Sequence, residues 1–335
     1  MKRKVSKSLL SAMVLMLLTL GFSVTALQTK AYYGERVSSI TQVDATYNSV
    51  TVQWGAASGA AGYNIYLNDI LNSNPIATVD AMTLSYTIAG LSENQSVTVW
   101  VAPYAYNTSG AVDEGSFEYG YAKTLSHITN LTYYVSYNEY GFNYKSPYQG
   151  LKVQWDKIDN CDGYQAVLYK KNGKVAQTLN LAGASTYGSW GNVNFTKATR
   201  KQAYYVQVRS YVNVANGVQK FSDWSGKLYC VPDPIPTSTS SDVGRYSIKM
   251  KWKKVAGASS YSIYVSNSSG KKGKKVATVK SNKNSYTIKK VGKSKVDTLK
   301  KYYYIRVVAN AKYGKKTKHS AAGFYISAHS TVRYY

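Results

Sequence analysis

The sequence predicts an all-β protein built from three consecutive two-sheet antiparallel sandwiches. Three tryptophans, Trp54, Trp155 and Trp252, recur at nearly equal intervals, and a tyrosine follows each of them nine residues later. Apolar and polar residues alternate on both sides of each tryptophan, which is the period-two pattern of half-buried strands. One structural unit is therefore repeated three times along the chain.

The chain begins with a segment typical of a signal peptide, residues 1–31. Basic residues precede an apolar run from Leu9 to about Val24, and small residues offer cleavage after Ala26 or Ala31. An N-terminal membrane anchor is the alternative, but the run of about 16 apolar residues is shorter than the roughly 20 that a spanning helix needs. We therefore expect an exported protein, either secreted, extracellular or associated with the cell surface.

The first domain is expected at residues 35–125. Val50 and Val52 alternate with polar residues before Trp54, and the next predicted strand opens at Tyr63. This domain has two Lys/Arg and eight Asp/Glu, a net charge of −6. It is the acidic part of an otherwise basic protein.

The second domain is expected at residues 126–231, with Trp155 and Tyr164 in the equivalent positions. The two cysteines of the chain, Cys161 and Cys230, both fall here, toward opposite ends of the expected sandwich. A disulfide requires Cα atoms within about 7 Å, so we expect both thiols to be unpaired.

A proline-rich segment at residues 232–241 holds three of the six prolines and is expected to be a semi-rigid, extended linker. The third domain follows at residues 242–330, with Trp252 and Tyr261 as its aromatic pair. From Asp233 onward there are 23 Lys/Arg and three Asp/Glu, a net charge of +20. Charge thus rises along the chain from an acidic first domain to a strongly basic third.

The repeats resemble fibronectin type III modules, which are immunoglobulin-like sandwiches. The marks of that family here are the tryptophan of the second strand, the tyrosine that opens the third, a Tyr-x-Val-x-Val strand such as Tyr204–Val208, and the Ser-rich SDWSG at Ser222–Gly226. A family leucine is matched by Leu91, whereas Leu299 of the third domain is out of step. The amino-acid sequences of the repeats are similar to those of modules in secreted or surface proteins of Gram-positive anaerobes.

The resemblance implies three tandem fibronectin type III-like domains that act as spacers, adhesins or enzyme accessories. It places six aromatic side chains in the domain cores: Trp54, Tyr63, Trp155, Tyr164, Trp252 and Tyr261.

No constellation typical of catalysis or metal binding stands out. The three histidines, His127, His319 and His329, lack ligand spacing from one another or from a cysteine. Asp156, Asp159 and Asp162 flank a loop and are interpreted as turn formers, because a calcium loop of the EF-hand type also needs a glycine and a final glutamate. We expect a protein that is not an enzyme and has no cofactor and no metal.

Lysine runs in the third domain indicate a surface for polyanions. Alternation places some lysines on the outer face of a sheet and others in loops, and most of the cations are point charges without the planar fork of arginine. The predicted polyanion-binding residues are Lys249, Lys251, Lys253, Lys271, Lys272, Lys274, Lys275, Lys289 and Lys290. The expected partners are cell-wall anionic polymers or an anionic membrane surface. No nucleic acid is expected, and the alternative role of the lysines is solubility.

Aromatic residues form a second candidate surface for a glycan or protein. A tyrosine-rich loop contributes Tyr140, Phe142, Tyr144 and Tyr148, and Trp100 is expected to face outward between buried valines. Local packing over an edge strand is the alternative.

Trp224 of the SDWSG segment is expected to stack on an outward cation such as Arg209 in the neighbouring strand. That contact has a structural role.

The sequence thus favours a secreted, noncatalytic, multi-domain binding or adhesion protein, held at the cell envelope by its basic third domain. The alternatives are a carbohydrate-binding or adhesive module that uses exposed tyrosine and tryptophan, and a passive spacer for envelope enzymes. We expect a monomer.

Overall fold

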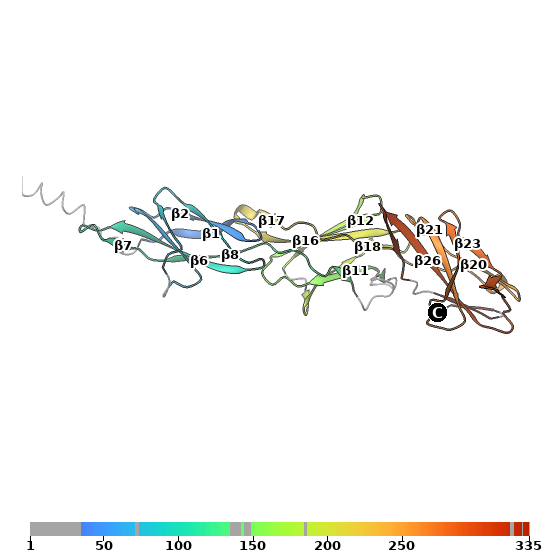
Figure 1. The fold of residues 1–335 in the computed structure, drawn as a ribbon. Coiled ribbons are helices and arrows are strands. Elements are labelled where there is room, and N and C mark those ends of the chain that lie inside the picture. Colours follow the sequence, from blue (N-terminus) through green and yellow to red (C-terminus); the bar gives the residue numbers. More distant parts are fainter. Residues whose placement is uncertain are drawn as a thin grey trace, which may run out of the picture. The chain divides into compact units, whose positions relative to one another are not determined.

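The computed structural model of the protein describes residues 35–70, 74–134, 142–143, 149–183, 186–321, 325–329 and 331–334. We divide them into module 1 (residues 35–125), module 2 (residues 126–230) and module 3 (residues 231–334), which Figure 1 shows as arrows coloured from blue to red. Module 1 forms one compact unit together with residues 213–220, and the rest of modules 2 and 3 forms a second compact unit.

Module 1 is a sandwich of two antiparallel sheets. Its strands are β1 (Ser38–Ala45), β2 (Ser49–Gly55), β3 (Gly62–Leu67), β4 (Ala77–Asp80), β5 (Ser85–Ala89), β6 (Ser96–Tyr106), β7 (Val112–Glu114) and β8 (Glu118–Lys123). One sheet has the order β1-β2-β5, and the other has the order β4-β3-β6-β7, with β8 also paired to β6.

Module 2 repeats this plan with additional short strands. Its elements are β9 (Thr132–Tyr133), β10 (Phe142–Asn143), β11 (Gly150–Asp156), β12 (Gly163–Lys170), β13 (Val175–Ala182), β14 (Thr186–Tyr187), β15 (Trp190–Phe195), β16 (Tyr204–Asn213), the 3-10 turn η1 (Ala215–Gly217), β17 (Gln219–Phe221) and β18 (Leu228–Cys230). One sheet has the order β10-β11-β15-β14 with β9 on β11, and the other has the order β13-β12-β16-β17 with β18 on β16.

Module 3 has the same two-sheet arrangement. Its elements are the 3-10 turn η2 (Ser240–Asp242), β19 (Val243–Gly244), β20 (Ser247–Lys251), β21 (Ser260–Ser266), β22 (Lys274–Lys280), β23 (Ser285–Ile288), β24 (Lys290–Val291), β25 (Ser294–Lys295), β26 (Tyr303–Tyr313), β27 (Lys316–His319), β28 (Ile326–His329) and β29 (Thr331–Tyr334). The sheets are β19-β20-β23 and β22-β21-β26-β28-β29, with β27 on β26, and β24 and β25 form a separate hairpin.

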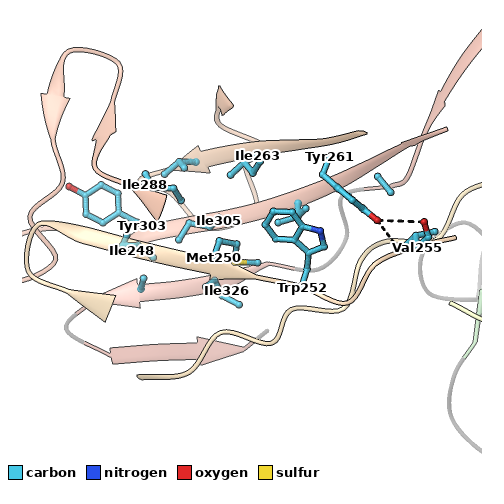
Figure 2. Packing of buried hydrophobic residues seen from close by; sticks show 14 of the residues in the cluster. Ile248, Met250, Trp252, Val255, Tyr261, Ile263, Ile288, Tyr303, Ile305 and Ile326 are labelled. Atoms are coloured by element: carbon cyan, nitrogen blue, oxygen red, sulfur yellow. Dashed lines mark hydrogen bonds between the residues drawn. The ribbon is translucent and has the colours of Figure 1, made fainter. Parts of the chain in front are cut away.

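Each module buries its own apolar cluster between its sheets, and inward and outward side chains alternate along strands such as β2 and β20. In module 3, Ile248, Met250 and Trp252 point inward from β20 and its end, while Lys249 points outward. Figure 2 shows this cluster, with Trp252 toward one end and Tyr303 toward the other. The predicted all-β fold of antiparallel sandwiches is confirmed.

The proline-rich segment, residues 232–241, is part of module 3 and not the semi-rigid linker that we expected. Ile235 O accepts the backbone N–H of Lys253 at 2.8 Å, and Thr237 donates its backbone N–H to Lys251 O at 2.9 Å, so this segment lies along β20 as an edge strand. Ser238 is fully buried, and its hydroxyl accepts the backbone N–H of Lys251 at 2.7 Å. Proline is tolerated in an edge strand because one side of it needs no backbone donor.

Modules 2 and 3 also share buried residues within their compact unit. Val231 and Ala203 are 2% and 0% exposed, and both belong to the core cluster of module 3 although Ala203 directly precedes β16 of module 2. Ala203 donates its backbone N–H to Ala256 O at 2.9 Å, and Tyr313 Oη donates to Tyr204 O at 2.7 Å. These contacts differ from our expectation of independent domains joined by a spacer.

Candidate interaction surfaces

Three cation-bearing segments of module 3 lie at the same end of its sandwich. The β21–β22 turn follows Ser266, which pairs with Tyr304 near the start of β26. The β19–β20 turn is at this end as well, because Thr298, on the segment that leads into β26, donates its backbone N–H to Arg245 O at 2.9 Å. The third segment, residues 289–302, contains the hairpin of β24 and β25 and leads into β26, and it belongs to the group since β24 contacts β22. Antiparallel pairing thus brings together lysines that are far apart in the sequence.

Glycines shape the β21–β22 turn. Gly270 and Gly273 have φ of 77° and 79°, in the left-handed region that favours glycine. A Cβ on Gly273 would lie 2.2 Å from Val265 O. The GKKGKK sequence therefore combines the two residues that the turn requires with four lysines that point to solvent.

We call the cations of these three segments the basic tip. All of them are exposed: Arg245, Lys271, Lys272, Lys274, Lys275, Lys289, Lys290, Lys293, Lys295, Lys300 and Lys301. Asp297 is the one acidic residue of these segments, and its Oδ1 lies 3.7 Å from Arg245 Nε. The tip therefore carries a large excess of positive charge.

The structure divides the nine lysines predicted from the sequence. Six of them belong to the basic tip: Lys271 and Lys272 of the β21–β22 turn, Lys274 and Lys275 at the start of β22, and Lys289 and Lys290. Lys249 is exposed on the outer face of β20, and Lys253 is exposed beyond the opposite end of that strand.

Lys251 is already paired, because its Nζ lies 2.7 Å from Asp242 Oδ1. Burial opposes ionisation of Asp242, but the Lys251 ammonium and the Thr239 backbone N–H outweigh it and lower the pKa of Asp242.

Sequence reasoning left five cations of the tip out of the site. Lys293, Lys295, Lys300, Lys301 and Arg245 lie in segments whose convergence depends on the register of the strands. The short runs KSK and LKK were the signal of the four lysines in the sequence, and Arg245 had none.

Large apolar side chains protrude among the cations of the tip. Tyr246 and Leu299 are each 57% exposed, and Tyr302 is 48% exposed. Arg245 lies over the Tyr246 ring, 4.9 Å from its centroid, and Tyr302 stacks on His329 with ring centroids 4.0 Å apart. No sequence signal singled out these three residues, apart from the irregular position of Leu299.

A second surface lies on the outer face of the larger sheet of module 1. Trp100 on β6 lies opposite Tyr66 on β3 and Tyr119 on β8, and it is half-buried beneath the Tyr119 ring at a centroid distance of 4.8 Å. Tyr121 is 67% exposed, and its ring meets Tyr119 edge-on at 5.7 Å. The predicted outward direction of Trp100 agrees with this register, but its indole is partly covered. We call these four residues the aromatic face.

Polar groups border the aromatic face. Glu114 Oε1 accepts hydrogen bonds from Tyr66 Oη at 2.7 Å and from Asn64 Nδ2. Burial and then the neighbouring Glu114 carboxylate raise the pKa of Tyr66. A row of rings beside hydrogen-bonding groups is a surface on which a sugar or an aromatic side chain can stack.

The predicted tyrosine-rich loop lies mostly outside the described residues. This applies to Tyr140, Tyr144 and Tyr148, and for Phe142 only the backbone within β10 is described.

The predicted stacking of Trp224 on Arg209 is confirmed, with the guanidinium carbon 4.4 Å from the ring centroid. Phe221 covers the same guanidinium at 3.8 Å, and Gln165 Oε1 accepts from Arg209 Nη2 at 2.7 Å. The arrangement ties β16 and β12 to the segment that follows β17, so it is structural.

Residues with reactive side chains are dispersed in the described part of the chain. No group of three or more His, Cys, Asp or Glu is placed to hold a metal there. Neither Cys161 nor Cys230 forms a disulfide, as expected, and burial raises the pKa of the Cys230 thiol. Among the three aspartates of the β11–β12 region, Asp156 accepts from Thr129 Oγ1 at 2.8 Å and Asp159 lies 2.9 Å from Lys157 Nζ. These side chains serve local loop structure.

Among the described residues no helix is long and apolar enough to cross a membrane. No protein-family model matches the sequence, and no curated protein matches it.

Solved structures similar to the chain are fibronectin type III domains. The FN1–FN3 domains of chicken CNTN1 share 14% identity, with a TM-score of 0.26, over 86% of this chain and 96% of that one. A two-domain segment of chicken tenascin shares 12% identity, with a TM-score of 0.29, over 58% of this chain and 98% of that one. FN3tt shares 22% identity, with a TM-score of 0.20, over 27% of this chain and 88% of that one.

Proposed function

We propose that the protein is a noncatalytic, multi-module binding or adhesion protein of the cell envelope, held there by the basic tip of module 3 through phosphate groups of an anionic polymer or an anionic membrane surface. The observation that carries the proposal is the gathering of eleven exposed cations at one end of module 3, with a single acidic residue that is itself paired. Such a charge density attracts phosphate-bearing polymers without requiring a specific ligand shape. Because module 3 makes this contact, the acidic module 1 is available to bind another partner.

Salt dependence tests this role. The chain from residue 35 to 335 should bind purified cell wall and a polyphosphate resin, and the affinity should fall steeply as sodium chloride rises, because phosphate contacts release counterions. Replacing Lys271, Lys272, Lys274 and Lys275 by glutamine should weaken binding on the order of a hundredfold. A binding constant that does not change with salt would contradict the proposal.

A matched variant controls for loss of net charge alone. Lys253, Lys312, Lys315 and Lys316 also number four, and they lie outside the three segments of the tip, around the opposite end of module 3. Their replacement by glutamine should weaken binding much less, because Debye screening limits charges to a range of about 8–10 Å in physiological salt. Equal losses in both variants would show that net charge, and not the tip, is responsible. In cells of the producer, a high-salt wash should release the protein from the envelope.

A glycan contact through the aromatic face of module 1 is the second candidate function. Its support is the edge-on and tilted array of Trp100, Tyr119 and Tyr121, next to Tyr66, whose hydroxyl donates to Glu114. Signal on a glycan array should then be lost when Tyr119 and Tyr121 are replaced by alanine. An array without signal for the unmodified chain would eliminate this candidate.

A further inference from the structure

We propose that the basic tip docks on the surface of a bilayer that contains anionic phospholipid, with Tyr246, Leu299 and Tyr302 entering the headgroup region. This inference rests on the proposed function, because it identifies the anionic surface that the tip contacts. Charge complementarity supplies the first argument. Juxtamembrane lysines are attracted to anionic headgroups, and eleven cations are available at the tip.

The exposed apolar side chains supply the second argument. A soluble phosphate polymer offers them no apolar environment, whereas the boundary between headgroups and acyl chains does. Tyrosine is enriched at that boundary because its ring is apolar and its hydroxyl is polar. The tip therefore has the composition of a surface that inserts shallowly, with cations around apolar residues that protrude.

Leu299 is exposed and does not belong to the described core cluster of module 3, so packing in the core does not account for a leucine at this position. In module 1 the leucine of the family pattern, Leu91, packs against the apolar cluster of that module, whereas Leu299 is out of step with that position. In module 3 the segment before β26 buries Val296, which is 0% exposed and belongs to the module 3 cluster. Leu299 follows in a turn held by Asp297, whose carbonyl accepts the backbone N–H groups of Lys300 and Lys301 at 3.2 and 3.1 Å. This turn presents the leucine side chain to solvent between lysines.

Position in the fold also suits docking. The opposite end of module 3 is occupied by contacts with module 2, including the Tyr313 hydroxyl on Tyr204 O and the Ala203–Ala256 hydrogen bond. Figure 2 shows Trp252, Tyr261 and Val255 toward that occupied end, whereas Tyr303, Ile248 and Ile288 lie toward the tip. The tip is thus the end of module 3 that module 2 leaves uncovered.

Vesicle co-sedimentation tests the inference with the chain from residue 35 to 335, which omits the apolar run of residues 9–24. The chain should sediment with vesicles of phosphatidylcholine and phosphatidylglycerol and remain in solution with phosphatidylcholine alone. The triple variant Tyr246→Ser, Leu299→Ser and Tyr302→Ser should partition onto the anionic vesicles about tenfold more weakly or worse. Its affinity for polyphosphate resin should not change, because no cation has been removed.

A triple variant of module 1 is the matched control for surface hydrophobicity. Met82, Tyr106 and Val112 are 90%, 62% and 54% exposed, and their replacement by serine should leave vesicle binding unchanged. A Leu299→Trp variant should in addition gain fluorescence that is quenched by brominated phosphatidylglycerol.

Each unfavourable outcome has a distinct meaning. If the tip variant binds vesicles as well as the unmodified chain does, and both bind polyphosphate, the bilayer inference fails and the proposed function stands. If vesicles of phosphatidylcholine alone are bound equally well, the anionic requirement fails and the inference with it. If the unmodified chain binds neither polyphosphate nor anionic vesicles, both proposals fail.

Discussion

Tyr261 packs against Trp252 with ring centroids 5.3 Å apart, and its hydroxyl accepts the backbone N–H of Val255 at 2.8 Å. Figure 2 shows this hydroxyl directed at Val255. The tyrosine therefore fills the core and also provides an acceptor for a donor in the turn after β20, three residues beyond the tryptophan. Without it, that buried donor would lack this partner.

The same relationship occurs in the other two modules. Tyr63 accepts the N–H of Ala57 at 3.2 Å, and Tyr164 accepts the N–H of Ile158 at 3.0 Å. In each case the acceptor bonds a residue three positions after the tryptophan. The recurring nine-residue spacing is thus explained by one hydrogen bond and one ring contact.

Tyr261→Phe isolates the hydrogen bond, since the ring is retained. It should lower the free energy of unfolding of module 3 by about 1–3 kcal/mol, because the Val255 N–H would remain buried without this acceptor. Urea denaturation followed by tryptophan fluorescence measures the loss. Tyr302→Phe, at an exposed position, is the control and should change stability by less than about 0.5 kcal/mol. Equal stability of the two variants would contradict the assigned role.

Two fragments of module 3 test the edge strand formed by the proline-rich segment. A fragment that starts at Cys230 retains Val231 and the hydrogen bonds of Ile235 and Thr237, whereas a fragment that starts at Asp242 lacks them. The shorter fragment should be less stable by about 2 kcal/mol or more, because it loses a buried valine and several backbone pairs. Urea midpoints that coincide would show that residues 231–241 add nothing to module 3.

Alkaline pH should destabilise the protein through its buried tyrosines. Burial raises the pKa of Tyr164, Tyr261 and Tyr313 above the usual value near 10. A raised pKa in the folded state means that the stabilisation is complete below about pH 10 and is lost as pH rises through the folded pKa. Tyrosinate absorbance should therefore increase in two phases, first from exposed tyrosines and then together with unfolding. A single phase near pH 10 with the fold intact would contradict the buried environments.

Asp242→Asn tests the ion pair between Asp242 and Lys251, which makes Lys251 unavailable for an anionic ligand. The lowered pKa of Asp242 in the folded state means that its contribution is present above about pH 4 and is lost as pH falls through the folded pKa. The substitution should cost about 0.5–1 kcal/mol at neutral pH, since the Lys251 side chain is 36% exposed, and progressively less in acid. Thermal unfolding at neutral and acidic pH measures both. A loss that is the same at both pH values would show that the charge of Asp242 does not matter.

Local pattern was sufficient to predict the modules. The alternation around each tryptophan and the spacing to its tyrosine depend on strand geometry alone, so the sandwiches could be anticipated from the sequence. The contact of Trp224 with Arg209 was predictable for the same reason, because register places outward residues of neighbouring strands side by side.

Long-range arrangement was not predictable in the same way. The proline-rich segment has the composition of a spacer, and only the free edge of β20 makes it a strand. The basic tip depends on three segments that are separated by many residues. Lys251 is not available for a ligand because it pairs with Asp242, nine residues before it. The exposure of Leu299 follows from Val296 taking the buried position in the same segment, which composition does not reveal.

The buried position of Val231 and Ala203 in the core of module 3 has a consequence for how such a gene can be rearranged. A recombination breakpoint between the codons of β18 and η2 would separate module 3 from residues that complete it. A duplication or exchange of gene segments that preserves folding should therefore copy the coding sequences of modules 2 and 3 together.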